Sequence, residues 1–381
     1  MKPKIAVVRG KFLNAYEMQF YEPLVKKFSI TGFGSKTSFH SRFAFPTVQL
    51  PSPMDLPDFP FKMPVLNRIF TDAHYLFGLE NSLKGFDIVH TAETYFHYTQ
   101  QCLNAKRKGY VKKVIATVLE NIPFNNEGIP GRKKFKLRAR VELDHIIALT
   151  HKTKDALLAE GADEKKITVI SHFVDTKQFK PAADVERRRF APNKKYFTVL
   201  FAGRLEEYKG IFDILDAAAM LLQDRVLKGF DIHYLFVGDG SQKEKMYIRE
   251  HALGLSGCVS HRNARYTEMP EIYNQADLFI APSKPTPTYA EQYCTALLEA
   301  QAAGLPIVTT KSGGIPENIA TAGILVTPGD SAAMAYALKN YILHAPLRRM
   351  YGHKARKRAV TVHDSLIGAG KLARLYTALL S

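Results

Sequence analysis

Short, continuous apolar runs alternate with longer segments of helical periodicity along almost the whole chain. In the first half, the apolar runs are rich in β-branched residues, which is typical of parallel strands covered on both faces. Segments of helical period lie between several of them, for example 97–108 and 151–160, and this alternation predicts βαβ units. The apolar runs are residues 4–8, 29–34, 86–92, 113–119, 145–150 and 167–171.

The alternation is interrupted at residues 180–195, where two prolines and a cluster of charges indicate a linker between domains. The pattern on either side predicts an α/β fold of two doubly wound domains, residues 1–182 and 193–362. The last segment, 363–381, carries the apolar stripe of a helix, which we expect to pack on one or both domains. The strand-like runs after the interruption are 197–203, 230–238, 258–263, 277–283, 306–310 and 323–328.

Composition limits the class of protein. The 381 residues are 46% hydrophobic, which is enough for two cores of ordinary size. Three cysteines without a CxxC pair argue against a disulfide framework or a thiolate zinc site, and they fit a reducing compartment. The apolar run before Arg9 is too short for a signal peptide, and no apolar stretch is long enough for a transmembrane helix. We therefore expect a cytoplasmic protein.

The formal net charge of +17 predicts an anionic partner, which can be a nucleic acid, lipid headgroups or a phosphorylated small molecule. No recognition-helix motif, zinc finger or RNP sequence accompanies the charge, so nucleic-acid binding is not favoured. Residues 131–146 have the pattern of a basic amphipathic helix, which can rest on anionic lipid or bind a lipid-linked acceptor. The alternative is a solvated helix that covers the sheet.

The loops that leave the strands of the second domain hold the candidate chemistry, because ligands of open parallel sheets bind beyond the carboxyl ends of the strands. Arg204 and Lys209 follow the run 197–203 and precede a helical segment. Two cations beside a helix start can neutralise a diphosphate. The alternative is a solvated turn in which Arg204 pairs with Glu206.

Two glutamates, Glu291 and Glu299, stand eight positions apart before the Gly-Gly turn at 313–314. If the segment is helical throughout, the glutamates are separated by about 12 Å along the axis and by about 80° around it. That geometry argues against a glycosidase pair, whose carboxyls lie about 5 to 9.5 Å apart. One carboxylate at each end of a sugar nucleotide fits better. The alternative makes Glu299 a surface helix residue and Glu291 a partner of the helix dipole.

The order of motifs resembles the retaining GT-B glycosyltransferases of family 4, strongly over residues 197–330 and more loosely over the first domain. The motifs are FAGRLEEYKG (201–210), VGDG (237–240), DLFIAPS (277–283), the pair Glu291 and Glu299, AGLPIV (303–308) and GGIPE (313–317). The resemblance implies two Rossmann-like domains facing across a cleft, with the C-terminal helix crossing back to the first domain. The first domain would hold the acceptor and the second the nucleotide sugar.

The resemblance also implies roles for individual residues. Arg204 and Lys209 would contact the diphosphate, Glu291 the hydroxyls of the transferred sugar, and Glu299 the ribose. The other residues implied on the nucleotide-sugar side are Asn263 near the base, Gly10 in the loop that approaches the phosphates, and Gly203, Tyr293, Cys294 and Thr295.

The implied chemistry is transfer with retention from a UDP-sugar, without a metal, to a glycan or lipid-linked acceptor at the inner membrane face. The absence of an Asp-x-Asp pair agrees with metal independence. Retention without an evident nucleophile favours attack on the same face, with the leaving phosphate oxygen taking the proton of the acceptor. A nucleotide-sugar epimerase and a sugar phosphorylase of the same fold are the alternatives.

Two departures from the family pattern affect the expected site. Gln292, Tyr293 and Cys294 replace the usual Gly-aromatic-Gly, and side chains in place of glycines restrict how closely the backbone can approach the donor. Glu120 stands where many relatives have a histidine, and it can either replace that group or be structural. On the acceptor side His90 is a core or a catalytic histidine, and Glu93 and His97 are weaker candidates.

Overall fold

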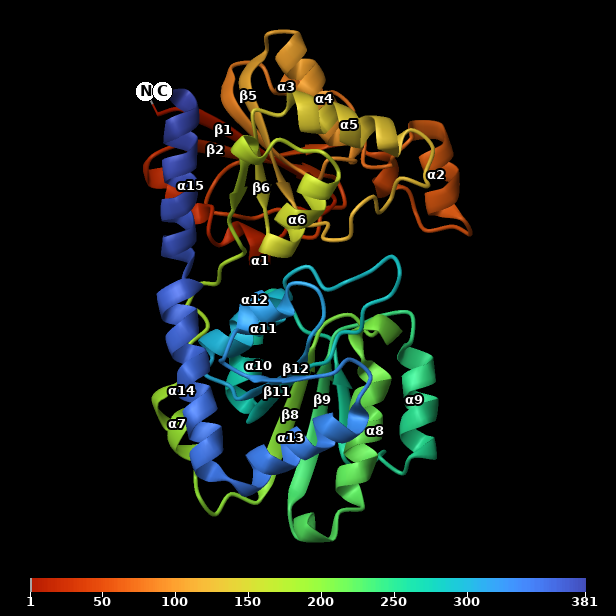
Figure 1. Cartoon of the computed structure of the whole chain (residues 1–381), viewed down its shortest axis with the longest axis vertical. Coiled ribbons are helices and arrows are strands. Elements are labelled where there is room, and N and C mark those ends of the chain that lie inside the picture. Colours follow the sequence, from red (N-terminus) through yellow and green to blue (C-terminus); the bar gives the residue numbers. More distant parts are fainter. Residues whose placement is uncertain (1) are drawn as a thin grey trace. The chain divides into compact units, whose positions relative to one another are not determined.

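The computed structural model describes residues 2–381, without the side chain of Arg187. The chain divides into two compact units (Figure 1). Unit 1 comprises Met1–Phe173 and Ser365–Ser381, and unit 2 comprises Val174–Asp364.

Unit 1 is built on a seven-stranded sheet with the order β3-β2-β1-β4-β5-β6-β7, and every neighbouring pair is parallel. The apolar runs of the first half therefore form strands as predicted, and β3 is an additional edge strand. The strands are β1 (Lys4–Gly10), β2 (Ser29–Ser35), β3 (Thr47–Leu50), β4 (Phe86–Ala92), β5 (Val111–Val118), β6 (His145–Ala148) and β7 (Ile167–Val169).

Helices cover both faces of this sheet, so the strands are buried on both sides. Ala6 and Val8 of β1 belong to one hydrophobic cluster, whereas Ile5 and Val7 belong to another, because successive strand residues point to opposite faces. The α-helices are α1 (Ala15–Met18), α2 (Lys62–Phe70), α3 (Leu79–Ser82), α4 (His97–Arg107), α5 (Arg132–Glu142), α6 (His151–Ala159) and α15 (Ser365–Leu380), and the 3₁₀ turns are η1 (Glu22–Lys26), η2 (Pro53–Asp55) and η3 (Glu164–Lys166).

The C-terminal helix α15 returns to unit 1, as the family resemblance implies. Its buried Leu372 and Tyr376 join the cluster that contains Ile5 and Val7. Position 368 in this helix is a glycine, and the Phe173 ring packs directly against its backbone. A Cβ atom built on Gly368 would lie 2.3 Å from the Phe173 ring, so the glycine permits close helix packing rather than merely weakening the helix.

Unit 2 has a six-stranded, entirely parallel sheet with the order β10-β9-β8-β11-β12-β13. Its strands are β8 (Tyr196–Ala202), β9 (Asp231–Val237), β10 (Val259–Arg262), β11 (Leu278–Ala281), β12 (Ile307–Thr310) and β13 (Ile324–Val326). Its helices are α7 (Ala183–Arg189), α8 (Ile211–Leu222), α9 (Lys243–Ala252), α10 (Met269–Gln275), α11 (Thr295–Ala302), α12 (Ile315–Ile319), α13 (Ser331–Leu343) and α14 (Ala345–Val362), with 3₁₀ turns η4 (Glu207–Lys209), η5 (Arg225–Leu227) and η6 (Tyr266–Glu268).

The boundary between the units differs from the linker expected at 180–195. That segment contains α7 and lies entirely within unit 2, while the chain divides at Phe173 and again at Asp364. The reason is Arg189, which is fully buried. Its guanidinium donates to the carbonyl oxygens of Tyr273 at 3.0 Å and Ala303 at 2.7 Å. The charge cluster that suggested a solvated linker therefore includes a buried hydrogen-bond donor that joins the segment to unit 2.

Candidate functional site

The order in which strands are added to the sheet of unit 2 reverses at β8, which lies between β9 on one side and β11 on the other. At such a switch point the loops after neighbouring strands diverge and leave a crevice at the carboxyl ends of the strands. The loop after β8 carries Lys209, and the loop after β11 carries Glu291. Although they are 82 positions apart, their side chains form an ion pair of 2.6 Å between Nζ and Oε2.

Two hydroxyl groups complete the surroundings of Glu291. Ser283 Oγ donates to Oε2 at 2.7 Å, and the Tyr289 hydroxyl donates to the same oxygen at 3.0 Å. Burial acts to raise the pKa of Glu291, but Lys209 and these hydrogen bonds lower it below its usual range. Burial acts to lower the pKa of Lys209, but the Glu291 carboxylate raises it above its usual value. Both groups are therefore charged at neutral pH.

The Gly-Gly turn positions Glu291 by close backbone contact. Gly313 has a φ of +54°, and a Cβ atom there would lie 1.8 Å from the carbonyl oxygen of Glu291. The next residue, Gly314, donates its N–H to that same oxygen at 2.8 Å. Any side chain at position 313 would push the Glu291 loop away. The carboxylate can therefore hold its position only with a glycine at 313.

The second glutamate, Glu299, lies in α11, but Glu291 does not. The helix begins at Thr295, and Cys294 before it has a left-handed φ of +54°. The helical spacing assumed for the two glutamates is therefore wrong, because the chain turns between them. The alternative that made Glu299 a surface helix residue is also wrong, since Glu299 is buried and its Oε2 accepts from the Tyr273 hydroxyl at 2.8 Å. Burial raises the pKa of Glu299 to about 7.

The start of α11 brings three predicted residues, Tyr293, Cys294 and Thr295, next to Glu291. The first N–H groups of a helix lack intrahelical partners and can receive a phosphate group. Asn318 holds the turn by donating to the carbonyl oxygens of Tyr293 and Cys294. The Tyr293 ring is buried, and burial raises the pKa of the Cys294 thiol to about 12, so these two residues offer backbone rather than reactive side chains.

The remaining predicted residues of unit 2 lie farther out. Arg204 is exposed over 69% of its side chain and donates to Glu206 at 3.1 Å, so the pairing considered from the sequence is present in the structure. Gly203 packs tightly against the loop after β9, since a Cβ atom on Gly238 would lie 2.0 Å from the Gly203 carbonyl oxygen. Asn263 is exposed just beyond the end of β10.

In unit 1, the structure places His90 in the core of β4. Its ring nitrogens lie 2.7 Å from the Tyr376 hydroxyl and 2.7 Å from Thr117 Oγ1, and burial lowers its pKa well below the usual value. Buried in this way, His90 cannot meet a substrate without a rearrangement, so the core interpretation replaces the catalytic one. Gly10 ends β1 with a φ of +54° and faces the ring of Tyr98.

Glu93 and Glu120 meet at the carboxyl ends of β4 and β5. The Oε1 atom of Glu93 accepts the backbone N–H groups of Leu119 at 2.9 Å and Glu120 at 3.2 Å. Its Oε2 atom is buried and has no hydrogen-bond partner among the described residues. Burial and the neighbouring Glu120 carboxylate raise the pKa of Glu93 to about 8. Burial also raises the pKa of Glu120, which is half-buried.

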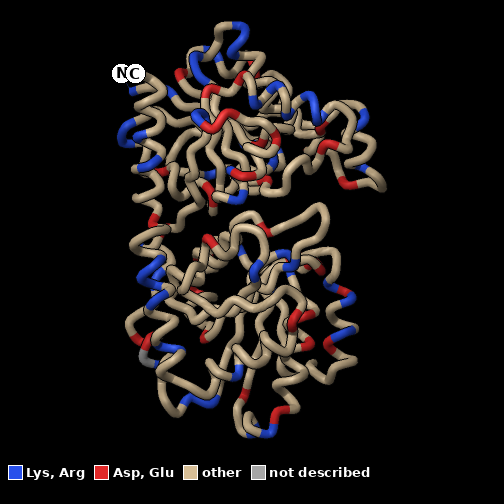
Figure 2. Tube along the Cα trace, viewed as in Figure 1, with Lys and Arg blue, Asp and Glu red and all other residues tan. Residues whose placement is uncertain are grey.

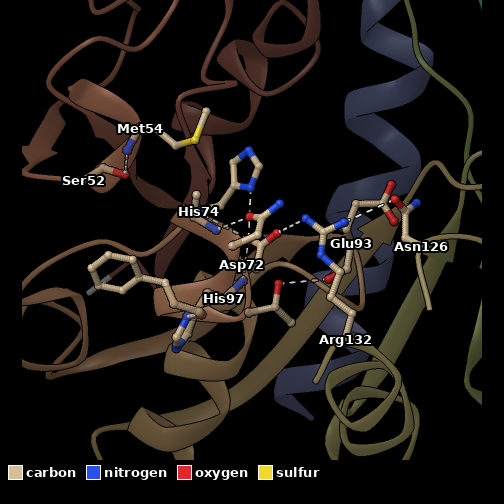
Figure 3. A network of polar contacts seen from close by, with 12 residues as sticks. Ser52, Met54, Asp72, His74, Glu93, His97, Asn126 and Arg132 are labelled. Carbon is tan, nitrogen blue, oxygen red and sulfur yellow. Dashed lines mark hydrogen bonds and ion pairs between the residues drawn. The ribbon is translucent and has the colours of Figure 1, made fainter. Parts of the chain in front are cut away.

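A polar network around Asp72 lies close to Glu93, and sequence reasoning missed its centre (Figure 3). The fully buried carboxylate accepts from His74 Nδ1 at 2.9 Å, from the His97 N–H at 3.2 Å, and from the guanidinium of Arg132. The weaker candidate His97 therefore belongs to this network through its backbone. No recognisable motif surrounds Asp72. The only signal in the sequence is that an aspartate and a histidine, Asp72 and His74, stand two positions apart.

The predicted basic helix exists as α5, but three of its six cations point inward. Arg132 pairs with Asp72, and Lys136 and Arg140 pair with the buried Glu160. The residues exposed on α5 are Lys133, Lys134, Leu137 and Val141. The sheet side of the helix therefore uses cations to satisfy buried carboxylates, as in the alternative of a helix that covers the sheet, and binding of anionic lipid by 131–146 stays a prediction.

Within residues 2–381, none of the helices combines the length and the hydropathy that a bilayer span requires, and no three His, Cys, Asp or Glu side chains are grouped so that they could hold a metal ion.

The chain forms two α/β units, each on a parallel sheet. The second unit holds a cation–carboxylate pair at its switch point, and helix α11 begins four residues after the carboxylate. This arrangement is that of the GT-B class of glycosyltransferases. Comparison with known families supports this. Residues 34–178 match the family described as Glycosyltransferase Family 4, and residues 183–358 match Glycosyl transferases group 1. The two matches together account for most of the chain, which belongs to these glycosyltransferases.

Known relatives are distant and longer. The chain is 29% identical over 226 residues to the D-inositol 3-phosphate glycosyltransferase of Corynebacterium jeikeium, a match covering 56% of this chain and 52% of the relative. It is 28% identical over 234 residues to the alpha-galactosylglucosyldiacylglycerol synthase of Streptococcus pneumoniae, covering 58% of this chain and 59% of the relative. The chain thus spans about half the length of the curated relatives it matches.

Similarity in structure extends over the whole chain. The Anabaena protein HepE, solved in complex with UDP and glucose, superposes with a TM-score of 0.76 over 99% of this chain and 100% of its own, at 16% identity. At that identity the similarity establishes the fold alone.

Proposed function

We propose that the protein transfers a sugar, with retention of configuration, from a UDP-sugar to a glycan or lipid-linked acceptor at the inner face of the cell membrane. The observation that carries the proposal is the ion pair of Lys209 and Glu291 at the switch point of unit 2, which is largely buried, with side chains exposed by 19% and 7%. Such a pair is costly to bury unless it has a use or excellent geometry. Here it stands at the carboxyl ends of the strands, where open α/β sheets bind ligands.

In this proposal different residues of unit 2 bind different parts of the nucleotide-sugar donor. Lys209 and the exposed Arg204 bind the diphosphate. The free N–H groups at the start of α11 also donate hydrogen bonds to its phosphate oxygens. Glu291 accepts hydrogen bonds from the hydroxyls of the transferred sugar, and Glu299 accepts them from the ribose. Gly203 lets the backbone approach the phosphates, and Asn263 lies beside the base.

The proposed reaction breaks the bond between the anomeric carbon and the phosphate oxygen and forms a bond from that carbon to the acceptor oxygen on the same face. The acceptor proton passes to the departing phosphate oxygen, so the products are the glycoside and UDP. The negative charge that develops on the leaving group is stabilised by Lys209, whose raised pKa keeps it protonated. We propose that this fixed charge makes a metal unnecessary.

The names of the relatives support the finer parts of the proposal. HepE was solved with UDP and glucose, which favours UDP over other nucleotides. The Streptococcus pneumoniae relative is named as a synthase of a glycosyldiacylglycerol, which favours a lipid-linked acceptor and a cytoplasmic protein attached to the membrane surface. The exposed Lys133 and Lys134 of α5 are the part of 131–146 available to anionic lipid.

The acceptor side of the proposal falls to unit 1. Glu93 has one carboxyl oxygen without a hydrogen-bond partner among the described residues, and Glu120 is half-buried beside it. Both follow the carboxyl ends of strands, as an acceptor-binding residue should. His90 is left out of this set because its ring is part of the core.

The first test is a thermal-shift panel of UDP, GDP, ADP and their common sugars, since a ligand at a hundred times its Kd adds about 2.7 kcal/mol of stability. We expect stabilisation by UDP and a UDP-sugar. Release of UDP is then measured with and without glycan and glycolipid acceptors. Release that depends on an acceptor supports transfer, whereas interconversion of the sugar without an acceptor would replace it with epimerisation. Formation of a sugar 1-phosphate from a glycan and inorganic phosphate, without release of UDP, would replace it with phosphorolysis.

A further inference from the structure

Helix α2 of unit 1 carries an unusual exposed apolar face. Phe61 immediately before the helix, Val65 and Ile69 are four positions apart, so they form one stripe along the helix. Their exposed fractions are 78%, 43% and 68%. Two further exposed apolar residues, Leu56 and Phe59, lie just before them in the chain. Singly exposed apolar residues are common, but a contiguous stripe of this kind marks an interaction surface.

A neighbouring face of α2, about 100° around the helix from the stripe, is anchored, which keeps the stripe turned outward. Leu66 packs with Met54 and Ala73 in a small hydrophobic cluster separate from the two main clusters of unit 1. The buried Lys62 donates to the carbonyl oxygens of Met54 and Leu56 and pairs with Asp58 at 3.1 Å. The helix is thus held by its inner side alone, and the stripe contributes nothing to this cluster.

Exposed cations lie beside the stripe. Arg68 is exposed on α2 itself, and Lys133 and Lys134 are exposed at the start of α5. The two helices are joined closely, because a Cβ atom on Gly131, which precedes α5, would lie 2.5 Å from Thr71, which follows α2. Lys and Arg positions occur on both helices (Figure 2), but farther along α5 the cations Lys136 and Arg140 are buried, so Lys133 and Lys134 are its exposed cations. An apolar stripe with neighbouring cations is the arrangement found on helices that lie in the interface of an anionic bilayer.

We propose that the stripe of Phe61, Val65 and Ile69 inserts into an anionic lipid surface, with Arg68, Lys133 and Lys134 at the level of the headgroups. Two observations favour lipid over a second copy of the chain. Two side chains of a nine-residue helix and the phenylalanine before it are far too few for a stable dimer, which buries about 800 Å² per partner. The chain also carries a net charge of +17, which repels a second copy and attracts anionic lipid.

This inference rests on the proposed function for the membrane at which the protein works, but its test does not depend on catalysis. The full chain is mixed with vesicles of phosphatidylcholine alone or of phosphatidylcholine and phosphatidylglycerol in equal parts, and the bound fraction is measured by flotation. We expect binding to the anionic vesicles. The double variant Phe61→Ser/Ile69→Ser should lose roughly a hundredfold in partition coefficient, since each large apolar side chain buried in lipid contributes about tenfold.

The matched control is Tyr336→Ser/Ile248→Ser in unit 2, whose side chains are exposed by 69% and 71%. This control should bind vesicles as the wild type does. A second variant, Lys133→Glu/Lys134→Glu, should lose the preference for anionic vesicles while keeping the stripe. Circular dichroism and thermal unfolding establish that each variant is folded.

Three results would overturn the inference. They are equal and negligible binding of the wild type to both vesicles, unchanged binding of Phe61→Ser/Ile69→Ser, and a wild-type dimer in light scattering that this variant dissociates. Thermal stabilisation by UDP is measured on the same proteins, so that failure of the lipid inference can be distinguished from failure of the proposed function. A protein that floats with vesicles but is not stabilised by any nucleotide would keep the lipid surface and lose the donor site.

Discussion

Glu291 in unit 2 and Glu93 in unit 1 occupy comparable positions. Each is buried, and each lies in the loop that follows a strand of a parallel sheet. Glu291 touches the ammonium group of Lys209 and accepts from two hydroxyls, and its pKa is lowered. Glu93 accepts from two backbone N–H groups, lies near another carboxylate, and has a pKa of about 8.

The difference shows that burial does not decide whether a carboxyl group is charged. Burial disfavours the charged form at both positions, and the nearby charge determines the outcome. At neutral pH the site of unit 2 therefore holds a fixed anion beside a fixed cation. The carboxyl of unit 1 is largely protonated and can donate a hydrogen bond. An ionised group suits the binding of a sugar hydroxyl beside a diphosphate, while a neutral one suits an acceptor that needs a donor and an acceptor in one place.

The largest effect is expected from Glu291→Ala. Loss of the carboxylate should lower kcat/KM by on the order of a thousandfold, as for removal of a group that acts in the transition state. Because Lys209 is left buried without its partner, the free energy of unfolding should also fall, by about 3 kcal/mol. Activity is measured as UDP release, and stability by urea unfolding.

The double variant Lys209→Met/Glu291→Gln distinguishes the two effects of that change. It removes the buried charge altogether and should recover most of the lost stability without recovering activity. If activity returned with stability, the pair would be structural, and the contrast between the two carboxyl groups would carry no functional meaning.

A smaller effect is expected from Arg204→Ala, because this cation is exposed and paired only with Glu206. Loss of one contact to the diphosphate should raise the KM for the donor about tenfold, with little change in unfolding. The control is Arg249→Ala, an exposed arginine paired with Asp216 on α8. Wild-type kinetics for Arg204→Ala would remove Arg204 from the donor site and leave Lys209 as its cation.

Glu93→Gln tests the unit 1 side of the comparison through pH. The folded-state pKa of Glu93 lies above its unfolded value, so the folded protein binds more protons between about pH 4.5 and about pH 8. This group therefore lowers the free energy of unfolding as pH rises through that window, and contributes no change below it. The free energy of unfolding of Glu93→Gln, measured with urea, should fall less across this pH window than that of the wild type. Parallel curves for the two proteins would mean that Glu93 is ionised like Glu291.

Chelation is expected to have no effect. If Lys209 supplies the positive charge that a metal would otherwise bring, activity after treatment with EDTA should equal that of the untreated protein, and added magnesium or manganese should not raise it. A loss of activity that magnesium restores would show that the charge pair of unit 2 is insufficient for the leaving group.

Much of the fold could be predicted from local pattern. The apolar runs 4–8 and 197–203 became β1 and β8, and the stripe in 363–381 became α15. Periodicity is a property of neighbouring residues, and a run buried on both faces has few alternatives to a parallel strand. The Gly-Gly turn at 313–314 could likewise be recognised as a feature of the site, although not why it was needed.

Only the tertiary structure decided which residues are partners and which are buried. It joined Lys209 to Glu291 across 82 positions, because strand order places the loops after β8 and β11 side by side. It turned the cations of α5 toward Glu160 and Asp72, and it buried Arg189 where a linker was expected. A charged residue looks the same in a sequence whether water or a carboxylate compensates it. The choice depends on elements far away along the chain, and local pattern carries no information about them.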